Sequence, residues 1–532
     1  MKIFVFIVVI FFGAFNLAKP QAVYHHVSNE AIYSFLDELA NAGIIQLVSV
    51  VKPYSREYIA HQLEVANDKR EQLNRRQQKA LDFYLRDFNK ELLPGKVYKK
   101  RLDLFYYKDS LFSISVNPIL GFQFWSNQNE NFYHRWNGAE AFAHVGDHLG
   151  VYASLRDNHE NIRLSDPAYL NTRGGANYKA QYDFSEMRGG ITWSWKWGTL
   201  GLVKDHFEWG NYYHYPNIFS SHPPSMAHVK INLKPVHWFE FNYVHAWMVS
   251  EVTDSSRSYW YTNSYGTFYR EVFQPKYLSA NLFTFRPLNK LHVSLGNSVI
   301  YSDMGLHPAY LIPVFFYKSV DHTLNSTGPN QRGQNSHMFI DLSVRNLKNV
   351  HFYSTLFIDE LAVSRFTNDT AHNFVSYRYG LQFSNIIPNT FLTLEYTKTL
   401  PLVYKHDMPT TTFESNLYNL GHYMQDNSRE LHVAFGLKPF RGFNFKFSYT
   451  FAQRGKDHTS LGTYRIGNPF LDTVEWEKRS AGVNLSYQVI NDAFVFASFT
   501  HREISGDKME IYTAPVYHGT TNTFSLGVNV GF

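Results

Sequence analysis

The chain has 532 residues, of which 44% are hydrophobic, 18% charged and 17% aromatic, with 37 Tyr and 45 Phe. The absence of cysteine excludes disulfide scaffolds, Cys-ligated zinc, thiol catalysis and a lipidated N-terminal cysteine. A mean hydropathy of −0.33 excludes a helical membrane protein, and a net charge of +5 is too small for this length to suggest nucleic acid as a partner.

Residues 1–22 have the features of a secretory signal peptide. Lys2 supplies a positive start, an uncharged apolar run follows over 3–15, and the small residues Ala18 and Ala22 offer cleavage sites. The alternative is an uncleaved membrane anchor, but this run is shorter than the roughly 20 residues that span a bilayer. We therefore expect an exported protein whose mature chain has no transmembrane helix.

Residues 23–101 have helical periodicity. The pattern predicts a first helix over 29–40, a second helix that begins after Ser55 as its N-cap, and a third over 68–88. A basic linker over 96–101 ends the region. Because the apolar stripes of these helices are narrow, we expect a small periplasmic helical region that packs on something larger.

From residue 102 to residue 532 apolar residues recur at every second position, as over 443–451 and 524–532. This pattern gives about 18 strand candidates, joined alternately by tight turns and by long connections. The long connections are rich in Tyr, Asn, Ser and His and lie at 157–185, 211–225, 251–272, 303–335, 403–427 and 507–521.

Short turns on one rim and long loops on the other are typical of an outer-membrane β-barrel, whose closure leaves no unpaired strand edge in lipid. We therefore predict an all-β transmembrane barrel of about 18 antiparallel strands over 102–532. The aromatic excess then forms the two interfacial girdles. The terminal Phe532 resembles the signal that the barrel assembly machinery reads, which we expect as a partner; the alternative is a soluble β protein that ends in Phe by chance.

No motif points to catalysis or to a cofactor. The 25 His residues show no metal-binding spacing, the glycine-rich 174–179 lacks the setting of a phosphate-binding loop, and no Gly-x-Ser-x-Gly sequence occurs. We expect no enzyme, no metal and no cofactor, although a hydrolase assembled from separate strands stays open as a third hypothesis.

The segment 207–226 is the most distinctive candidate for binding. Aromatic faces stack on the C–H faces of sugar rings, while Asn, His and Ser bond hydroxyl groups, so this composition favours a carbohydrate. Its candidate polysaccharide-binding residues are Trp209, Tyr212, Tyr213, His214 and Tyr215. The alternative, an aromatic girdle with an ordered loop that closes the barrel mouth, has equal weight.

Two further expectations concern the loops. Arg156 and Lys318 are candidate charge partners if the glycan is acidic. The apolar, proline-marked stretch within 303–335 would be an aggregation hazard if exposed, so we expect it to fold into the lumen as a plug.

Three features resemble the capsule-assembly Wzi family of outer-membrane proteins, in the form found in Bacteroidetes-type bacteria. They are the signal with a helical region containing Pro53-Tyr-Ser-Arg-Glu-Tyr-Ile59, the pair Trp209-Gly210 followed by Ser220-Ser-His-Pro-Pro-Ser-Met226, and the strand count with an aromatic end. The resemblance implies a barrel with a periplasmic helical bundle that holds capsular polysaccharide as a lectin-like anchor, not an enzyme. The candidate site residues rest on the composition of the loops and are not carried over from the family.

The sequence therefore favours a monomeric protein of the Gram-negative outer membrane, in contact with lipid, that anchors or assembles capsular polysaccharide or exopolysaccharide through its extracellular loops. The alternative is a diffusion channel for small solutes or sugars, because 18 strands can enclose an aqueous lumen.

Overall fold

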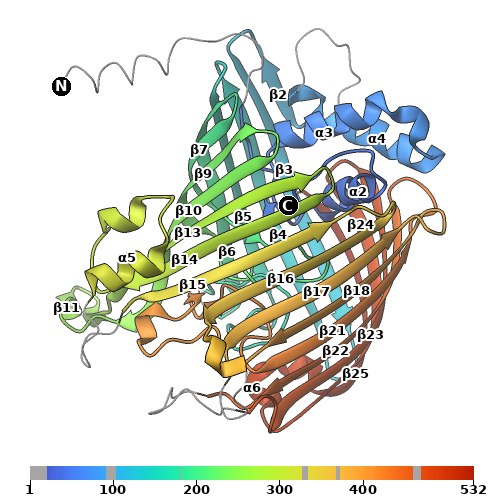
Figure 1. The fold of residues 1–532 in the computed structure, drawn as a ribbon. Coiled ribbons are helices and arrows are strands. Elements are labelled where there is room, and N and C mark those ends of the chain that lie inside the picture. Colours follow the sequence, from blue (N-terminus) through green and yellow to red (C-terminus); the bar gives the residue numbers. More distant parts are fainter. Residues whose placement is uncertain are drawn as a thin grey trace, which may run out of the picture.

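The computed structural model describes residues 21–91, 103–179, 181–325, 333–366, 372–458 and 469–531. Eighteen antiparallel strands form a closed barrel, as predicted (Figure 1). The barrel strands are β3 (Phe112–Ser126), β4 (Asn131–Val145), β5 (Leu149–Glu160), β6 (Asp183–Trp195), β7 (Gly198–Asp205), β9 (Met226–Val236), β10 (Phe239–Thr253), β13 (Phe273–Leu288), β14 (Leu291–Ser302), β15 (Asn335–Val344), β16 (Val350–Glu360), β17 (Phe374–Ser384), β18 (Thr390–Thr399), β21 (Ser428–Leu437), β22 (Phe443–Gly455), β23 (Val474–Ile490), β24 (Ala493–Ser505) and β25 (Gly519–Val530).

The barrel closes where β25 pairs antiparallel with β3. A short strand, β2 (Phe105–Lys108), pairs with β3 beside this seam. The first barrel strand, β3, begins and the last, β25, ends at the rim of tight turns, and the long connections lie at the other rim. The wall has an apolar outer face: on β14, Leu295 is exposed while its neighbour Ser294 is buried. Among the described residues, no helix is both long enough and apolar enough to cross a membrane.

The helical region has its own hydrophobic core. It contains α2 (Glu30–Asn41), β1 (Val51–Lys52), α3 (Arg56–Asp68) and α4 (Arg75–Phe88). Ser55 caps α3 as predicted, since its side chain accepts a hydrogen bond from the N–H of Tyr58. The third helix begins later than predicted, because η1 (Arg70–Gln72) interrupts the charged segment and Asn74 forms a new N-terminal cap.

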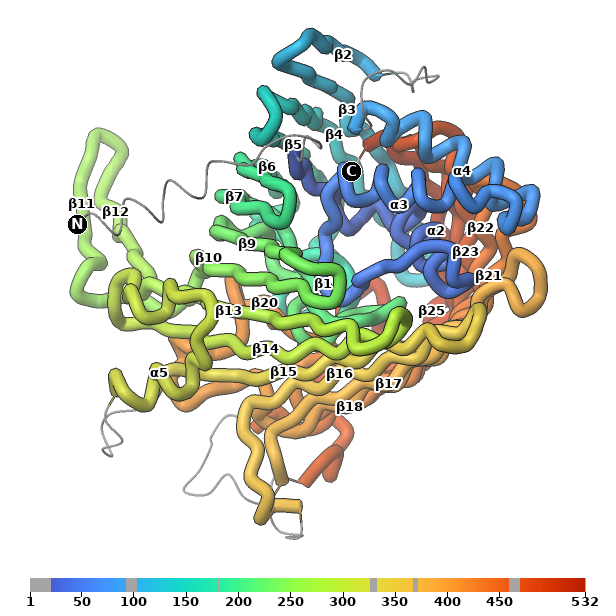
Figure 2. The backbone as a smooth tube through the Cα atoms, turned by 45° about the horizontal axis from the view of Figure 1, so that its top comes forward, coloured from blue at the N-terminus to red at the C-terminus, as the bar shows by residue number. Residues whose placement is uncertain are grey.

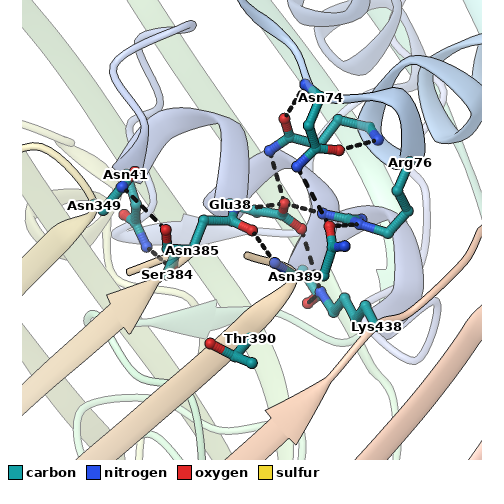
Figure 3. A network of polar contacts seen from close by, with 12 residues as sticks. Glu38, Asn41, Asn74, Arg76, Asn349, Ser384, Asn385, Asn389, Thr390 and Lys438 are labelled. Carbon is teal, nitrogen blue, oxygen red and sulfur yellow. Dashed lines mark hydrogen bonds and ion pairs between the residues drawn. The ribbon is translucent and has the colours of Figure 1, made fainter. Parts of the chain in front are cut away.

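This helical region covers the tight-turn mouth of the barrel (Figure 2). Glu38 on α2 is the centre of a polar network between the helical region and the barrel (Figure 3). Its carboxylate pairs with Arg76 and accepts hydrogen bonds from Gln77 at 2.8 Å and from Asn385, in the β17–β18 turn, at 2.7 Å. Burial alone would raise the pKa of Glu38, but Lys438 and Arg76 hold it below its usual value. The region is therefore docked on the barrel through charge-assisted contacts.

Three segments fill one side of the lumen, and we call them the plug: residues 48–52, 206–225 and 400–427. The strand β8 (Glu208–Trp209) pairs with β1, and Phe219 stacks on Phe413. Together with inward side chains of β10–β17 they form one hydrophobic core inside the barrel.

The prediction that 303–335 plugs the lumen is wrong for the described parts of this connection. Figures 1 and 2 both show α5 (Tyr317–Leu324) outside the ring of strands, beside β14 and β15. Tyr301, which shares the outward face of β14 with Leu295, packs against Tyr310 in this connection. Aromatic contacts with the outer wall therefore hold the segment there.

Three expectations fall outside the described residues: the signal peptide over 1–20, the linker over 96–101 and the terminal Phe532.

Candidate functional site

Two carboxylates of the inner wall hold the aromatic segment of the plug. Asp341 on β15 accepts the backbone N–H of Asn211 at 2.8 Å. Glu395 on β18 accepts the backbone N–H groups of Tyr213 and His214, each at 2.8 Å. Because backbone donors to a carboxylate make strong hydrogen bonds, the segment is fixed against the wall at successive positions.

His214 continues this row of contacts along the wall. Its Nε2 lies 3.5 Å from Oε1 of Glu430 on β21, and its ring stacks on His432 with centroids 3.7 Å apart.

The tyrosines of the segment are also held by specific contacts. The Tyr212 hydroxyl donates to Glu208, and Lys52 Nζ lies 4.0 Å from the centroid of the Tyr212 ring. Burial raises the pKa of the Tyr212 hydroxyl, and the Glu208 carboxylate raises it further. The hydroxyls of Tyr213 and Tyr215 pair with His351 and His222 at 2.8 and 3.0 Å, so these rings are fixed before any ligand arrives.

A cavity of about 940 Å³ lies beside the plug, and we call it the luminal cavity. Its wall comes largely from β3–β6 and β21–β25. Aromatic rings line it together with hydrogen-bonding side chains. The lining includes Gln123, His134, Trp136, Ser154, Phe184, Asn444, Ser486, Phe494, Phe496 and Asn529.

The luminal cavity has an excess of positive charge. Its described lining contains eight Lys and Arg residues against four Asp and Glu residues. Arg156 and Arg188 come from neighbouring strands, and Arg173 comes from the long connection that follows β5. The buried Nε of Arg156 has no hydrogen-bond partner among the described residues. A low-dielectric cavity of this kind attracts anions.

The structure brings five of the seven predicted site residues to this cavity: Tyr212, Tyr213, His214, Tyr215 and Arg156 all line it. They meet in the lumen and not on an exposed extracellular loop, because the pairing of β8 with β1 draws the segment inward.

The other two predicted residues lie elsewhere. Trp209 is 0% exposed and packs among Phe207, Phe219 and Phe339, so in this conformation its ring cannot stack on a sugar. Lys318 lies on α5, outside the wall, and is not part of the cavity lining.

The sequence analysis missed two features, one inside the site and one outside the cavity. The first is the pair of carboxylates Asp341 and Glu395. The sequence pattern that could have indicated them is an acidic residue at a position of a predicted strand that faces the lumen. The second is the hairpin of β11 (Tyr259–Asn263) and β12 (Gly266–Arg270), which extends beyond the barrel wall (Figure 2) and exposes Trp260 and Tyr265 by 70% and 89%.

One group among the described residues has the donor atoms for a metal ion: His26, Asp205 and His206, whose ligand atoms lie within 4.8 Å of one another. Here the two His rings bond each other at 3.0 Å, and Asp205 accepts a hydrogen bond from Tyr152 at 2.8 Å. These internal contacts already engage the three side chains and join the helical region to β7.

Comparison with known proteins places the fold. No family model matches the chain, and no curated protein matches its sequence. The structure is similar to that of Wzi, an outer-membrane protein described as a carbohydrate-binding β-barrel involved in group 1 capsule assembly in Escherichia coli, with a TM-score of 0.59, 12% identity and coverage of 96% of this chain and 100% of that one. OprD of Pseudomonas aeruginosa matches with a TM-score of 0.42 and 9% identity over 78% of this chain and 94% of its own. The chain therefore has the fold of outer-membrane β-barrels.

Proposed function

We propose that this chain is a monomeric outer-membrane protein of a Gram-negative bacterium that holds an acidic capsular polysaccharide or exopolysaccharide at the cell surface. It binds the polymer without catalysis, and the luminal cavity receives acidic sugar units. The observation that carries this proposal is the combination of fixed tyrosines with an excess of Lys and Arg in one cavity. The carbohydrate binding described for the structurally similar Wzi supports it.

The chemistry of the cavity matches such a ligand. Tyr212 and Tyr213 offer partly buried rings, Arg156 offers an unpaired donor, and Lys446 adds a cation from β22. A uronic acid needs a cation for its carboxylate, hydrogen-bonding groups for its hydroxyls and an aromatic face for its ring, and the lining supplies all three.

Binding to purified protein tests the proposal. We expect polygalacturonate to be retained, dextran to be retained much less, and retention to fall as salt is added, because salt screens the long-range attraction of an anionic polymer to the positive cavity. Arg156→Gln should weaken polygalacturonate binding by about tenfold or more, the effect expected of one charge-assisted hydrogen bond.

A matched control lies on the neighbouring strand. Arg135 of β4 is exposed on the outer face, so Arg135→Gln removes the same charge without touching the cavity and should leave binding unchanged. Equal binding of dextran and polygalacturonate, or equal losses in the two variants, contradicts an acidic-glycan site.

Deletion of the gene tests the role in the cell. We expect polysaccharide to be synthesised but released into the medium. Unchanged cell-bound polysaccharide in the deletion strain contradicts the anchor.

A second candidate function, a diffusion channel, is favoured by the extent of the cavity lining. It runs from Tyr84 on α4 and Arg441 at the tight-turn rim to Arg173 and Gly174 in a long connection at the other rim. Planar-bilayer recording separates the two: steady currents favour the channel, and electrical silence favours the anchor.

A further inference from the structure

The segment 303–325 covers a polar area on the outer face of the barrel, and we call it the clasp. Ser279 and Asn281 on β13 and Asn297 on β14 point outward, on the same faces as Phe283 and Leu295. Ser279 and Asn281 are nevertheless 0% exposed, and Asn297 is 7% exposed. An amide side chain that faces hydrocarbon without a partner is costly, so something has to cover this area.

The clasp satisfies these side chains with its own backbone. Ser279 donates to the carbonyl of Tyr310 at 2.7 Å. Asn281 donates to the carbonyls of Pro313 and Phe315, each at 2.9 Å.

The same contacts fix the start of α5. The N–H of Tyr317 donates to Asn297 Oδ1 at 2.9 Å, and the Tyr310 and Tyr317 rings are buried in an outer cluster with Tyr243 and Val299. The hydrogen bonds and rings together seat the clasp in a defined position on the wall.

The opposite surface of the clasp is apolar and uncovered over 308–317, and its exposed polar residues, such as Asp303 and His322, lie outside this stretch. Between Pro308 and Tyr317 it carries no charged residue. Its exposed side chains are Leu311, Ile312, Val314, Phe315 and Phe316, with exposures from 37% to 60%. This surface continues the apolar outer face of the wall, on which Leu295 and Ile340 are also exposed.

We propose that the stretch 308–317 of the clasp is embedded in the membrane, where the acyl chains of the outer leaflet contact Val314 and Phe316 as they contact the strands. It converts a polar part of the wall into an apolar one: its backbone satisfies the amides beneath it and its side chains meet the lipid. This inference rests only on the membrane location of the barrel, not on glycan binding.

The natural absence of cysteine makes a site-specific test direct. Val314→Cys and Phe316→Cys would each be labelled with a polarity-sensitive fluorophore in the full chain and reconstituted in phosphatidylcholine vesicles. Leu295→Cys, on the bare wall, is the lipid-facing reference, and Glu130→Cys, exposed between β3 and β4 at the long-loop rim, is the aqueous reference. Quenching by nitroxide on the acyl chain is compared with quenching by aqueous iodide.

We expect the labels at 314 and 316 to be quenched by the acyl-chain nitroxide to the same extent as the label at 295, and to be protected from iodide. Iodide quenching equal to that at 130, with the label at 295 still quenched by lipid, overturns the clasp proposal alone. Protection from both quenchers indicates a protein partner or a second copy and also overturns it. A label at 295 that lipid does not quench would instead contradict the membrane location.

Discussion

The two halves of the lumen differ in what faces inward. Along β9–β18, inward residues such as Leu278, Ala280 and Phe357 are buried against the plug with at most 1% exposure. Along β21–β25 and β3–β6, inward residues such as Lys446 and Ser486 line the luminal cavity. The same alternation of inward and outward residues along the strands therefore supports a packed core on one side of the barrel and a polar cavity on the other.

The difference shows how a binding site can be fixed inside a wide barrel. The packed half anchors the plug, and the plug presents Tyr212 and His214 to the open half. The position of the segment is thus set largely by residues outside the cavity lining, such as Asp341 and Glu395.

The largest effect is expected from Trp209→Ala in the packed half. Removing a fully buried indole leaves a void, so the free energy of unfolding should fall by about 3–5 kcal/mol. Denaturant unfolding in detergent measures this, and bilayer recording should show new current as the plug loosens. The exposed Trp260 is the control, since Trp260→Ala should change stability by at most about 0.5 kcal/mol. Equal effects of the two variants contradict a packed plug.

The strands of the barrel wall could be predicted from the sequence, because apolar residues recur at every second position in each strand, independently of how the adjoining loop folds. It did not predict where the loops fold. The segments 207–226 and 303–335 each contain three prolines and several aromatic residues, yet the first lies inside the barrel and the described parts of the second lie outside it. Their positions depend on partners far along the chain, Glu395 for the first and Asn281 for the second, and such pairing leaves no periodic pattern.

The site was predicted in part for the same reason. Tyr212–Tyr215 and Arg156 are local signals of chemistry and do line the cavity. Trp209 carried the same local signal but lies in the core, because the pairing of β8 with β1 decides its burial.

A smaller effect is expected where the helical region docks over the packed half. Glu38→Gln keeps the size of the side chain but removes the charge between Arg76 and Lys438, at an expected cost of about 1.5–3 kcal/mol in docking. Hydrogen exchange in α2 should become faster. Asp82→Asn breaks the exposed Arg70 pair on the same region and should cost less than about 1 kcal/mol. If hydrogen exchange in α2 is equally fast in the two variants, the Glu38 contacts do not hold the helical region on the barrel.

Acidification should also weaken the packed half. Burial lowers the pKa of His222 in the plug to about 4, below the value of about 6.5 expected when unfolded. The neutral ring is therefore favoured in the fold; its contribution is complete above about pH 6.5 and falls by about 2 kcal/mol by pH 5. His222→Gln should flatten the dependence of stability on pH over this range, while the exposed His61→Gln on α3 should not. A dependence that persists unchanged in His222→Gln would assign the titration to other groups.

The smallest expected change in stability comes from a Gly→Ala substitution in the open half of the lumen. Gly482 on β23 faces the open half, where an added Cβ would meet Thr500 Oγ1 at 3.3 Å and make ordinary contacts, at 3.5 Å or more, with its other neighbours. Gly482→Ala should therefore change the free energy of unfolding by at most about 0.5 kcal/mol.

The same change in the packed half serves as its contrast. Gly296 on β14 faces the core, where a Cβ would overlap the Phe339 ring and the backbone oxygen of Asn281, so Gly296→Ala should cost about 1–3 kcal/mol. Denaturant unfolding of both variants under one condition measures the difference. A cost that is equal at the two positions means that the open half is as tightly packed as the plugged half, and the luminal cavity could then not admit a sugar ring without rearrangement of the wall.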